Sequence, residues 1–463
     1  MDQLVSTPLW PHQAEQVARL EEEPRILNGW QMGTGKTLFA VERDLRLRLA
    51  EYHGPTLVVA PMNTHESWAT TFKNNTDLRV RVVDRKARER LVRNNHKYGD
   101  ADVYIVHYDV LRLMPELINF FGHGIFDECH KLKSRGTKQT KAAKKLGIPF
   151  LTDMSGSPVT DRPQDIWSVL NHLKPKTYSS YWKFYHRYVD YEILYPQSYH
   201  KVLGPSDAWL REGLPNLKEF FTRVLKEDVL PDLPPKTYTQ VHVDLTPQQR
   251  KQYEEMKRDM LTWLENNWYT DDEPEPLAAR AVIAQLQRLQ MFALGTAYFN
   301  SVGKLVLQDP SSKVDAVMEI LEDNPDEQFV IFTNFKGPLR ILRERFDKIG
   351  ITYGSFTGDD SQPRREAAKR AFIEGRKRCL LGTISSGGVG VDGLQHASCN
   401  VIFLDRNWSP AVNEQAEDRL HRGGQTRTVQ VIDVIARDTV DGGRLQRLEL
   451  KKSWIKKMLG DGL

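Results

Sequence analysis

Short apolar runs alternate with longer polar, helix-forming stretches in two separate regions of the chain. The strands predicted in the first region are residues 25–27, 56–61, 102–108, 123–128 and 150–155. Those predicted in the second region are residues 328–335, 351–358, 378–385, 400–407 and 429–436. Such alternation is typical of a parallel sheet covered by helices. We therefore predict an α/β fold with two lobes.

The stretch between these regions, roughly residues 161–310, is rich in helix formers and aromatic residues, and the proline-marked sequence LPDLPPKTY interrupts it at 230–238. It predicts an inserted helical region. We expect a first lobe over 1–235, with a helical insertion from about 161, and a linker with a second helical protrusion over 236–310. A second lobe over 311–463 follows, ending in a basic amphipathic helix at 444–459 that braces the lobes. A membrane-surface helix is the alternative for 444–459.

Composition supports more than one domain in an intracellular protein. A chain of 463 residues is too long for one hydrophobic core. The three cysteines lie far apart without CxxC spacing, which argues against a zinc site or a disulfide framework. The N-terminus resembles no signal peptide, and no window approaches 18 continuous apolar residues. We expect a cytoplasmic monomer of a bacterium or of a virus-infected host cell, with no membrane contact.

The sequence GWQMGTGKTL at 29–38 predicts a phosphate-binding loop between a strand and a helix. Backbone N–H groups of Gly33, Thr34, Gly35 and Lys36 would face the phosphates of ATP, and the Lys36 ammonium would reach the β and γ oxygens. The hydroxyl of Thr37 would hold Mg²⁺. Trp30 stands where the full loop pattern has its first glycine.

The sequence GIFDECHKLKS at 124–134 supplies two adjacent acids at the end of a predicted strand, about 90 residues after the loop. Asp127 is positioned to orient Mg²⁺, and Glu128 to position and deprotonate the attacking water. A surface pair of acids is the alternative interpretation. The phosphate-binding loop upstream favours the catalytic one.

The spacing QxxxRxxR joins Gln415, Arg419 and Arg422 in the second region. On a helix, this spacing places both arginines on one face. An arginine carried into an ATP cleft stabilises charge on the transferring phosphate and contributes roughly 10³–10⁵ in rate. A solvated helix with salt bridges from Glu417 and Asp418 is the alternative.

The order of these motifs resembles the Swi/Snf-type ATPases of helicase superfamily 2, over nearly the whole chain. The motifs that carry the resemblance are LWPHQAEQV (9–17), the phosphate-binding loop, APMNTHESW (60–68), VHYDVLR (106–112), the DECH box, SGSPVTDRPQDIWSVLNHLKP (155–175), RVLKEDVLPDLPPK (223–236), VIFTNF (330–335), GTISSGGVGVDGLQHA (382–397), DRNWSP (405–410) and QAEDRLHRGGQ (415–425). The resemblance implies two RecA-like lobes that use ATP and Mg²⁺. It also implies a compact motor of bacterial or viral type with no accessory domain.

Several further site residues follow from the resemblance alone. Gln13 is the expected purine contact and Asp392 a nucleotide contact, while Pro61, Thr383 and Trp408 are expected at nucleic acid. Burial of Trp408 against the first lobe is equally open. This chain departs from the family at four places: Trp30-Gln31 stands where Asp-Glu is usual, Cys129 replaces a small residue, Arg223-Val224 replaces paired arginines, and Asp392 replaces Asn.

Residues 131–145 carry seven basic residues and no acid, directly after the DECH box. Such a strip binds backbone phosphates without reading sequence, and Lys131, Lys133, Arg135 and Lys138 are the candidate contacts. A solvated basic helix is the alternative. Residues 178–199 hold nine aromatics among 22 residues. We expect them to fill the core of the helical insertion rather than to stack on bases.

The motifs together predict an ATP-dependent translocase on double-stranded or branched DNA, which moves along DNA or remodels forks, junctions or DNA-bound proteins. A nucleotide-gated binding switch and a strand-separating DNA or RNA helicase are the alternatives. The complete set of acids and arginines favours the motor, because a pure switch does not need it.

Overall fold

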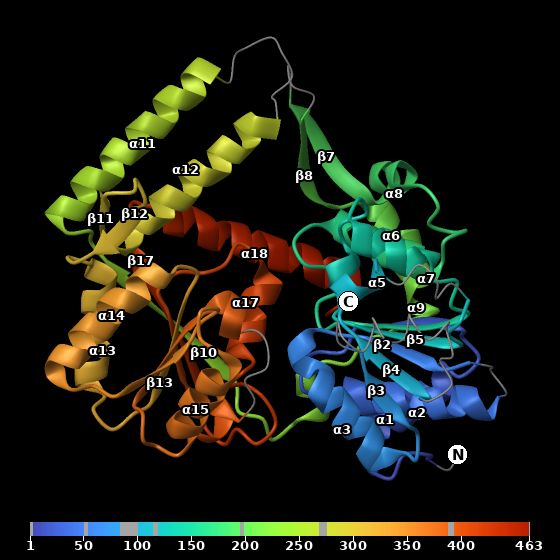
Figure 1. The fold of residues 1–463 in the computed structure, drawn as a ribbon. Helices are drawn as coiled ribbons and strands as arrows, with labels where there is room; N and C mark the ends of the chain where they lie inside the picture. Colours follow the sequence, from blue (N-terminus) through green and yellow to red (C-terminus); the bar gives the residue numbers. More distant parts are fainter. Residues whose placement is uncertain are drawn as a thin grey trace. The chain divides into compact units, whose positions relative to one another are not determined.

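The computed structural model describes residues 3–50, 54–83, 101–113, 119–194, 199–267, 276–387 and 393–462. The chain forms two compact units. The first comprises residues 1–192, 200–231 and 453–463, and the second comprises 193–199 and 232–452. Figure 1 shows that each unit is built on a sheet with helices packed on it, which confirms the predicted α/β class.

The first unit contains a seven-stranded sheet in the order β3-β4-β2-β5-β6-β1-β9. Every neighbouring pair in it is parallel. Met154 is in register with Asn28 on one side and with Asp127 on the other, so these three strands end at one level. The strands are β1 (Arg25–Asn28), β2 (Thr56–Val59), β3 (Val80–Val82), β4 (Val103–Val106), β5 (His123–Asp127), β6 (Phe150–Met154) and β9 (Phe221–Thr222).

Alternate side chains of these strands enter two different cores, as the two-residue period of a strand requires. Leu57 and Val59 face a core formed with α5 (Tyr108–Leu111), α6 (Lys138–Lys145), α7 (Trp167–Leu173) and α9 (Leu214–Lys218). Val58 faces the opposite core, formed with α2 (Lys36–Leu49) and α3 (His65–Asn75). Burial on both faces explains why these strands are continuous apolar runs in the sequence.

The second unit contains a six-stranded sheet in the order β10-β17-β16-β13-β15-β14, again parallel throughout. Its strands are β10 (Lys236–Val243), β13 (Phe329–Thr333), β14 (Tyr353–Phe356), β15 (Cys379–Thr383), β16 (Asn400–Phe403) and β17 (Val429–Ala436). One face packs on α13 (Ser312–Asp323) and α14 (Lys336–Ile349). The other packs on α15 (Gln362–Ile373) and α17 (Pro410–Glu417). The short helix α16 (Ile384–Gly387) follows β15.

The region between the two predicted lobes contains helices and, in addition, strands that the sequence pattern did not reveal. The helices are α7, α8 (Tyr181–Tyr188), α9, α10 (Lys226–Val229), α11 (Pro247–Asn267) and α12 (Pro276–Leu294). Two-stranded sheets join β7 (Val189–Leu194) to β8 (Tyr199–Pro205) and β11 (Thr296–Phe299) to β12 (Leu305–Gln308). Strand β10 lies in the expected linker. Most of its side chains are exposed, and it is a strand because it pairs with β17 at eight positions. The predicted lobe boundaries stay predictions.

The last helix, α18 (Val440–Leu459), begins in the second unit, and its residues from Ser453 onward are part of the first. Within the first unit, Met458 and Leu459 are buried in the core that contains Trp209. The indole N–H of Trp209 donates to the Met458 carbonyl at 3.0 Å. Among the described residues, no helix combines the length and the apolar character that crossing a membrane requires.

A buried group of charged side chains holds the end of α17 to the sheet of the second unit. Glu417 accepts from Lys236 Nζ at 3.0 Å and from Arg406 Nη1 at 2.6 Å. Arg406 also pairs with Asp433 of β17 and lies 3.7 Å above the Phe403 ring. Burial alone would raise the pKa of Glu417, but the charges of Lys236 and Arg406 lower it to about 2. The charges are therefore compensated inside the unit.

We predict that Glu417→Gln lowers the free energy of unfolding of the second unit by roughly 3 kcal/mol near neutral pH, because it leaves two buried cations undercompensated. The pKa of Glu417 is lower in the folded than in the unfolded chain. Its stabilisation is therefore complete above the unfolded pKa and is lost as the pH falls towards about 2. Urea titrations followed by circular dichroism, near pH 7 and near pH 3, measure the difference. It should shrink at the lower pH.

The matched control is Glu319→Gln, because Glu319 is exposed on α13 and should change stability by less than about 0.5 kcal/mol. A Glu417→Gln protein that unfolds like the wild type at both pH values would contradict the assignment.

Candidate active site

The predicted phosphate-binding loop lies between the end of β1 at Asn28 and the start of α2 at Lys36. Gly33 and Gly35 adopt positive φ angles of 81° and 86°, a conformation that favours glycine. A Cβ atom at Gly35 would lie 2.3 Å from Gln13 Nε2, so a larger residue there would displace the Gln13 side chain. Thr37 follows Lys36 in the first turn of α2, and the N-terminus of this helix presents N–H groups suited to an anion.

Lys36 folds back on its own loop. Its ammonium donates to the carbonyl oxygens of Trp30 and Gln31, each at 2.8 Å. Burial lowers its pKa to about 8, although the nearby carboxylates of Glu128 and Asp127 act to raise it. A partly buried ammonium of lowered pKa gains from an anion beside it.

Helix α1 (Pro11–Arg19) holds the loop from its other side. Gln13 is buried and donates from Nε2 to the Gly35 carbonyl at 2.9 Å, while its Oε1 accepts from the Trp10 N–H at 2.7 Å. The His12 ring nitrogen Nε2 lies 3.0 Å from the Thr34 carbonyl. The structure thus places the expected purine contact, Gln13, directly against the loop.

Trp30, which stands in place of the expected glycine, is a core residue. Its side chain is fully buried and packs with Phe39 of α2 and with His12. The indole N–H donates to Thr222 Oγ1 at 2.7 Å. Val224, the residue that departs from the family's paired arginines, belongs to the same apolar cluster. The two departures are therefore parts of one packing arrangement.

Arg223 connects the beginning of the loop with the end of the chain. Its guanidinium donates to the Gly29 carbonyl and, at 3.2 Å, to the Gly156 carbonyl. It also pairs with both carboxylate oxygens of Asp461, at 2.9 and 2.7 Å. A two-bonded arginine–carboxylate pair fixes geometry as well as charge, so Arg223 positions the backbone from which the loop departs.

Asp127 is the last residue of β5, at the carboxyl edge of the sheet. Its Oδ2 accepts from the indole N–H of Trp68 at 2.9 Å, and its backbone carbonyl accepts from Tyr108 Oη at 2.7 Å. Burial and the adjacent charge of Glu128 raise the pKa of Asp127 to about 6. A divalent cation would relieve this repulsion.

Glu128 has a left-handed backbone, with φ 54° and ψ 49°. This conformation costs energy in a residue other than glycine and is commonest at functional sites. The carboxylate lies 3.2 Å from His130 Nδ1 and accepts from Ser155 Oγ at 3.4 Å. Cys129, which follows Glu128, is fully buried in the core beneath it, and burial raises the pKa of its thiol well above the ordinary value.

The strand order brings the loop and the two acids together at one edge of the sheet. The carboxyl ends of β1, β6 and β5 are neighbours. The charges of Glu128 and Asp127 act on Lys36 to raise its pKa. These groups suit ATP and Mg²⁺, because an ammonium and a helix N-terminus can receive phosphate, while two adjacent acids of like charge can receive a cation. Thr37 and Asp127 carry side-chain oxygens, the kind of ligand that Mg²⁺ prefers, and would hold the ion if it binds here.

The other predicted residues of ATP chemistry belong to the second unit. Gln415 is on α17, but this helix ends at Glu417, so the expectation that Arg419 and Arg422 share one helical face was wrong. The physical reason is the ion group described above, in which Lys236 binds both Glu417 and Asp418 and fixes the chain where the helix ends. Arg419 is buried and Arg422 is partly buried. Asp392 lies outside the described residues.

The predicted nucleic-acid contacts differ in exposure. Lys131, Arg135 and Lys138 are exposed, whereas Lys133 is partly buried and pairs with Asp161 at 3.1 Å. Pro61 and Thr383 are buried.

Trp408, another predicted nucleic-acid contact, keeps 38% of its surface exposed. Its indole lies 5.2 Å from the Arg444 guanidinium. With its amide oxygen turned toward them, Gln290 accepts from Trp408 Nε1 at 2.7 Å and from Arg444 Nη2 at 3.0 Å.

Two residues at the site were not predicted from the sequence. Trp68 is the last residue of the motif APMNTHESW, and Arg223 is the first of RVLKEDVLPDLPPK. Both motifs were therefore signals for them. Nothing in the local pattern indicates that Trp68 reaches Asp127 or that Arg223 reaches Asp461, because these pairs are 59 and 238 residues apart.

The fold and the site together define a helicase-like protein with two RecA-like lobes. Residues 25–290 match the SNF2-related domain family and residues 312–424 match the helicase conserved C-terminal domain. The chain belongs to the SNF2-related family, which confirms the resemblance seen in the sequence.

Individual relatives are more distant. An "Uncharacterized ATP-dependent helicase" of Mycoplasma pneumoniae is 29% identical over 436 residues, which are 93% of this chain and 40% of that protein. The Hef helicase domain of Pyrococcus furiosus has a similar fold, with a TM-score of 0.56 and 18% identity over 94% of this chain and 97% of that one. The Sulfolobus solfataricus SWI2/SNF2 ATPase core in complex with dsDNA gives a TM-score of 0.46 and 23% identity, over 100% of this chain and 95% of that one. This chain thus spans 40% of the length of the curated relative.

We predict that Trp30→Ala lowers the free energy of unfolding of the first unit by roughly 3–5 kcal/mol, because it empties a fully buried site beside α2. Trp30→Phe keeps the aromatic ring and loses the hydrogen bond to Thr222, so it should cost about 1–2 kcal/mol. Urea unfolding of the two variants against the wild type checks the order. Equal stability of all three proteins would mean that Trp30 does not support the loop.

Proposed function

We propose that the chain is an ATP-dependent translocase on double-stranded DNA. The observation that carries the proposal is the meeting of Lys36, Asp127 and Glu128 at the carboxyl edge of the first sheet. A lysine of a phosphate-binding loop beside two strand-end acids is the arrangement that ATP hydrolysis requires. Membership of the SNF2-related family supports the choice of reaction.

Each residue of this edge has a distinct role in the proposal. Backbone N–H groups from Gly33 to Lys36 cradle the phosphates of ATP, and Lys36 neutralises the β and γ oxygens. Glu128 orients the attacking water and accepts its proton. Thr37 and Asp127 hold Mg²⁺, which neutralises phosphate charge when bound. Gln13 contacts the purine, and Asp392 is a further nucleotide contact suggested by its motif.

The second unit supplies the remaining groups of the reaction. Gln415, Arg419 and Arg422 are proposed to complete hydrolysis, with the arginines stabilising negative charge on the transferring γ-phosphate. Their supply by a separate unit would couple the nucleotide state to domain movement.

DNA binding is proposed to rest mainly on the basic strip. This strip comprises the exposed residues Lys131, Arg135, Lys138, Lys141 and Lys145. No acid occurs between residues 131 and 145, so the strip suits a phosphate backbone, and binding should weaken steeply with salt. Pro61, Thr383 and Trp408 are further contacts suggested by their motifs. Forks, branched junctions and DNA-bound proteins are the targets on which such a motor would act.

We predict that Lys36→Ala and Glu128→Gln each reduce ATP turnover below about a tenth of the wild-type rate. Glu128→Gln should still bind ATP, because the phosphate cradle is intact. Steady-state hydrolysis with duplex DNA and equilibrium binding of a fluorescent ATP analogue measure the two properties. Glu219→Gln, an exposed acid of the first unit, is the control and should leave both unchanged. ATP turnover above about a tenth of the wild-type rate in both active-site variants would contradict the roles proposed for Lys36 and Glu128.

We also predict that the protein tracks along duplex DNA without separating its strands, because phosphate contacts to an intact duplex require no base contact. The decisive measurement is ATP-dependent displacement of a triplex-forming third strand, beside a forked-duplex unwinding assay. The expected result is displacement of the third strand without unwinding of the fork. Unwinding of a plain fork with no third-strand displacement would make the protein a conventional helicase. Nucleotide-dependent binding with neither activity would make it a switch.

A further inference from the structure

Helix α8 and the adjoining strands carry a group of stacked rings, which we call the aromatic platform: Tyr181, Trp182, Tyr185, His186, Tyr191 and His200. The Trp182 and His186 rings are stacked at 5.7 Å and 22°. His200 is stacked on Tyr185 at 5.6 Å and on Tyr191 at 4.5 Å. Tyr191 Oη lies 2.7 Å from His186 Nδ1 and links the two stacks.

Part of the platform is open to solvent. The aromatic residues of this region were expected to fill a core, and Tyr178, Phe184 and Tyr185 do so. Trp182 does not, because 52% of its surface is exposed. His186 is exposed as well. An exposed indole that already stacks on a neighbouring ring can continue the stack onto a flat ligand.

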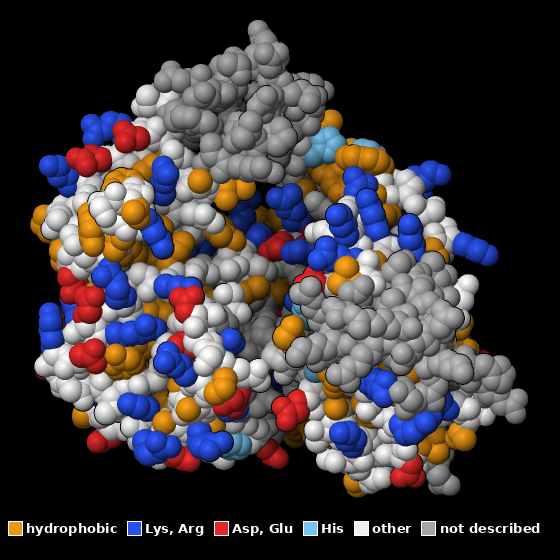
Figure 2. All heavy atoms as spheres, viewed as in Figure 1, with side chains coloured by type: hydrophobic (Ala, Val, Ile, Leu, Met, Phe, Trp, Pro, Cys, Tyr) orange, Lys and Arg blue, Asp and Glu red, His pale blue; other side chains and the backbone are white. Residues whose placement is uncertain are grey.

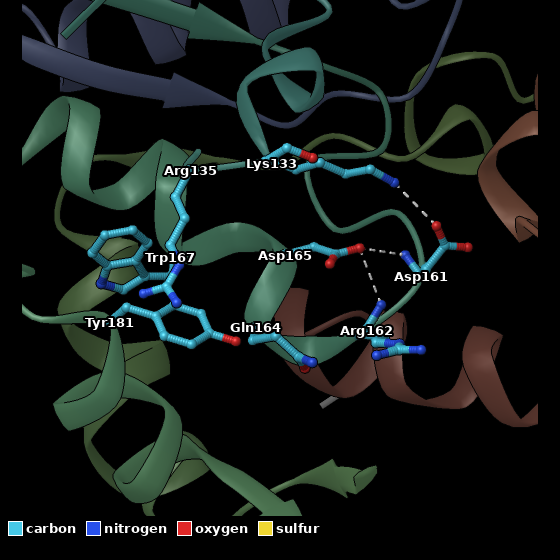
Figure 3. Close-up of a pocket in the computed structure, with 9 residues that line it drawn as sticks. Lys133, Arg135, Asp161, Arg162, Gln164, Asp165, Trp167 and Tyr181 are labelled. Carbon is cyan, nitrogen blue, oxygen red and sulfur yellow. Dashed lines mark hydrogen bonds and ion pairs between the residues drawn. The ribbon is translucent and has the colours of Figure 1, made fainter. Parts of the chain in front are cut away.

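Arg135 joins the platform to the basic strip. Its guanidinium lies 4.0 Å from the centre of the Tyr181 ring and 5.7 Å from that of Trp182. Figure 3 shows Arg135 directed onto Tyr181 at one side of a pocket that Lys133 and Gln164 also line. Cationic and aromatic groups therefore meet at this point, as in sites that bind nucleotides by stacking and charge together.

The charge around the platform favours a polyanion. Figure 2 shows Lys and Arg side chains gathered beside His and hydrophobic side chains in the region of α6 and α8. The two carboxylates that line the pocket beside Arg135 are already used within the protein, because Asp161 pairs with Lys133 and Asp165 accepts from the N–H groups of Asp161 and Arg162. A protein surface could also use exposed Trp and Arg, but five exposed cations without an acid between residues 131 and 145 favour phosphates.

The pocket beside Arg135 has a volume of about 300 Å³. Its lining includes Gln164, whose Oε1 atom is buried and has no hydrogen-bond partner among the residues that the structure describes. Buried acceptors are normally satisfied. The exocyclic amino group of a nucleobase is a hydrogen-bond donor of the kind that this atom lacks.

We propose that the aromatic platform binds unpaired nucleotides next to a duplex, with their phosphates on the basic strip. Bases inside a duplex already stack on each other and cannot cover Trp182, whereas the bases of a single-stranded extension can. The inference rests on the proposed function and adds a substrate class to it. A duplex that carries a single-stranded extension or branch would be held by both its helical and its unpaired parts.

The test compares a blunt duplex with the same duplex carrying a single-stranded extension of about ten nucleotides, at one fixed salt concentration. The extension contains 2-aminopurine, whose fluorescence falls when it stacks. Trp182→Ala should weaken binding of the extended duplex about tenfold and reduce the quenching, with less than about a twofold change for the blunt duplex. Trp182→Phe should retain most of the binding. The control is Phe299→Ala, which removes an aromatic residue of β11 that is 64% exposed, and it should match the wild type.

Three outcomes would overturn the proposal. Equal affinity of Trp182→Ala and wild type for both DNAs would mean that the platform does not touch DNA. Equal weakening on both DNAs would make Trp182 a duplex contact. Unchanged DNA binding with altered self-association in sedimentation would make the platform a protein interface. Failure of the proposed function is a separate result, because the wild-type ATPase would then not respond to the blunt duplex.

Discussion

The parallel alignment of the strands is the constraint on which the site depends. In a parallel sheet all carboxyl ends meet at one edge, so loops that are distant in sequence become neighbours there. Met154 makes this concrete, because it pairs with Asn28 before the phosphate-binding loop and with Asp127 before Glu128. The segments that carry the side chains of the candidate active site do not have to extend far from the sheet. They start from adjacent strand ends whose register is fixed by backbone hydrogen bonds.

The two units differ in how far their buried charges are compensated by neighbouring groups. In the second unit, Glu417 pairs with both Lys236 and Arg406, and its pKa falls to about 2. In the first unit, burial lowers the pKa of Lys36 to about 8, and burial with a like charge raises that of Asp127 to about 6. The ion group around Glu417 is complete without a ligand and stabilises the fold. The charges of Lys36 and Asp127 lie in unfavourable surroundings, which a bound phosphate and a cation would correct.

The sequence was sufficient where a feature depends on neighbours in the chain. The buried strands appear as apolar runs, and the loop around Lys36 and the acids at Asp127 appear as short motifs. It was insufficient where the feature depends on distant residues. Strand β10 is recognisable only through β17, and α17 ends early because Lys236 binds residues at its end. The exposure of Trp182 could likewise not be predicted from the sequence, since an aromatic helix of the same composition could be fully buried.

The packing of Trp30 with Val224 also restricts which substitutions the chain can accept at these two positions. By the resemblance described above, the family usually has an acid at the first position and an arginine at the second, whereas this chain has two apolar residues in one buried cluster. Opposite charges and an apolar pair are both workable in a buried site, but a single charge facing an apolar partner is costly. Either replacement alone would pass through a less stable protein. The two positions are therefore expected to exchange as a pair among descendants, so that each residue predicts the other.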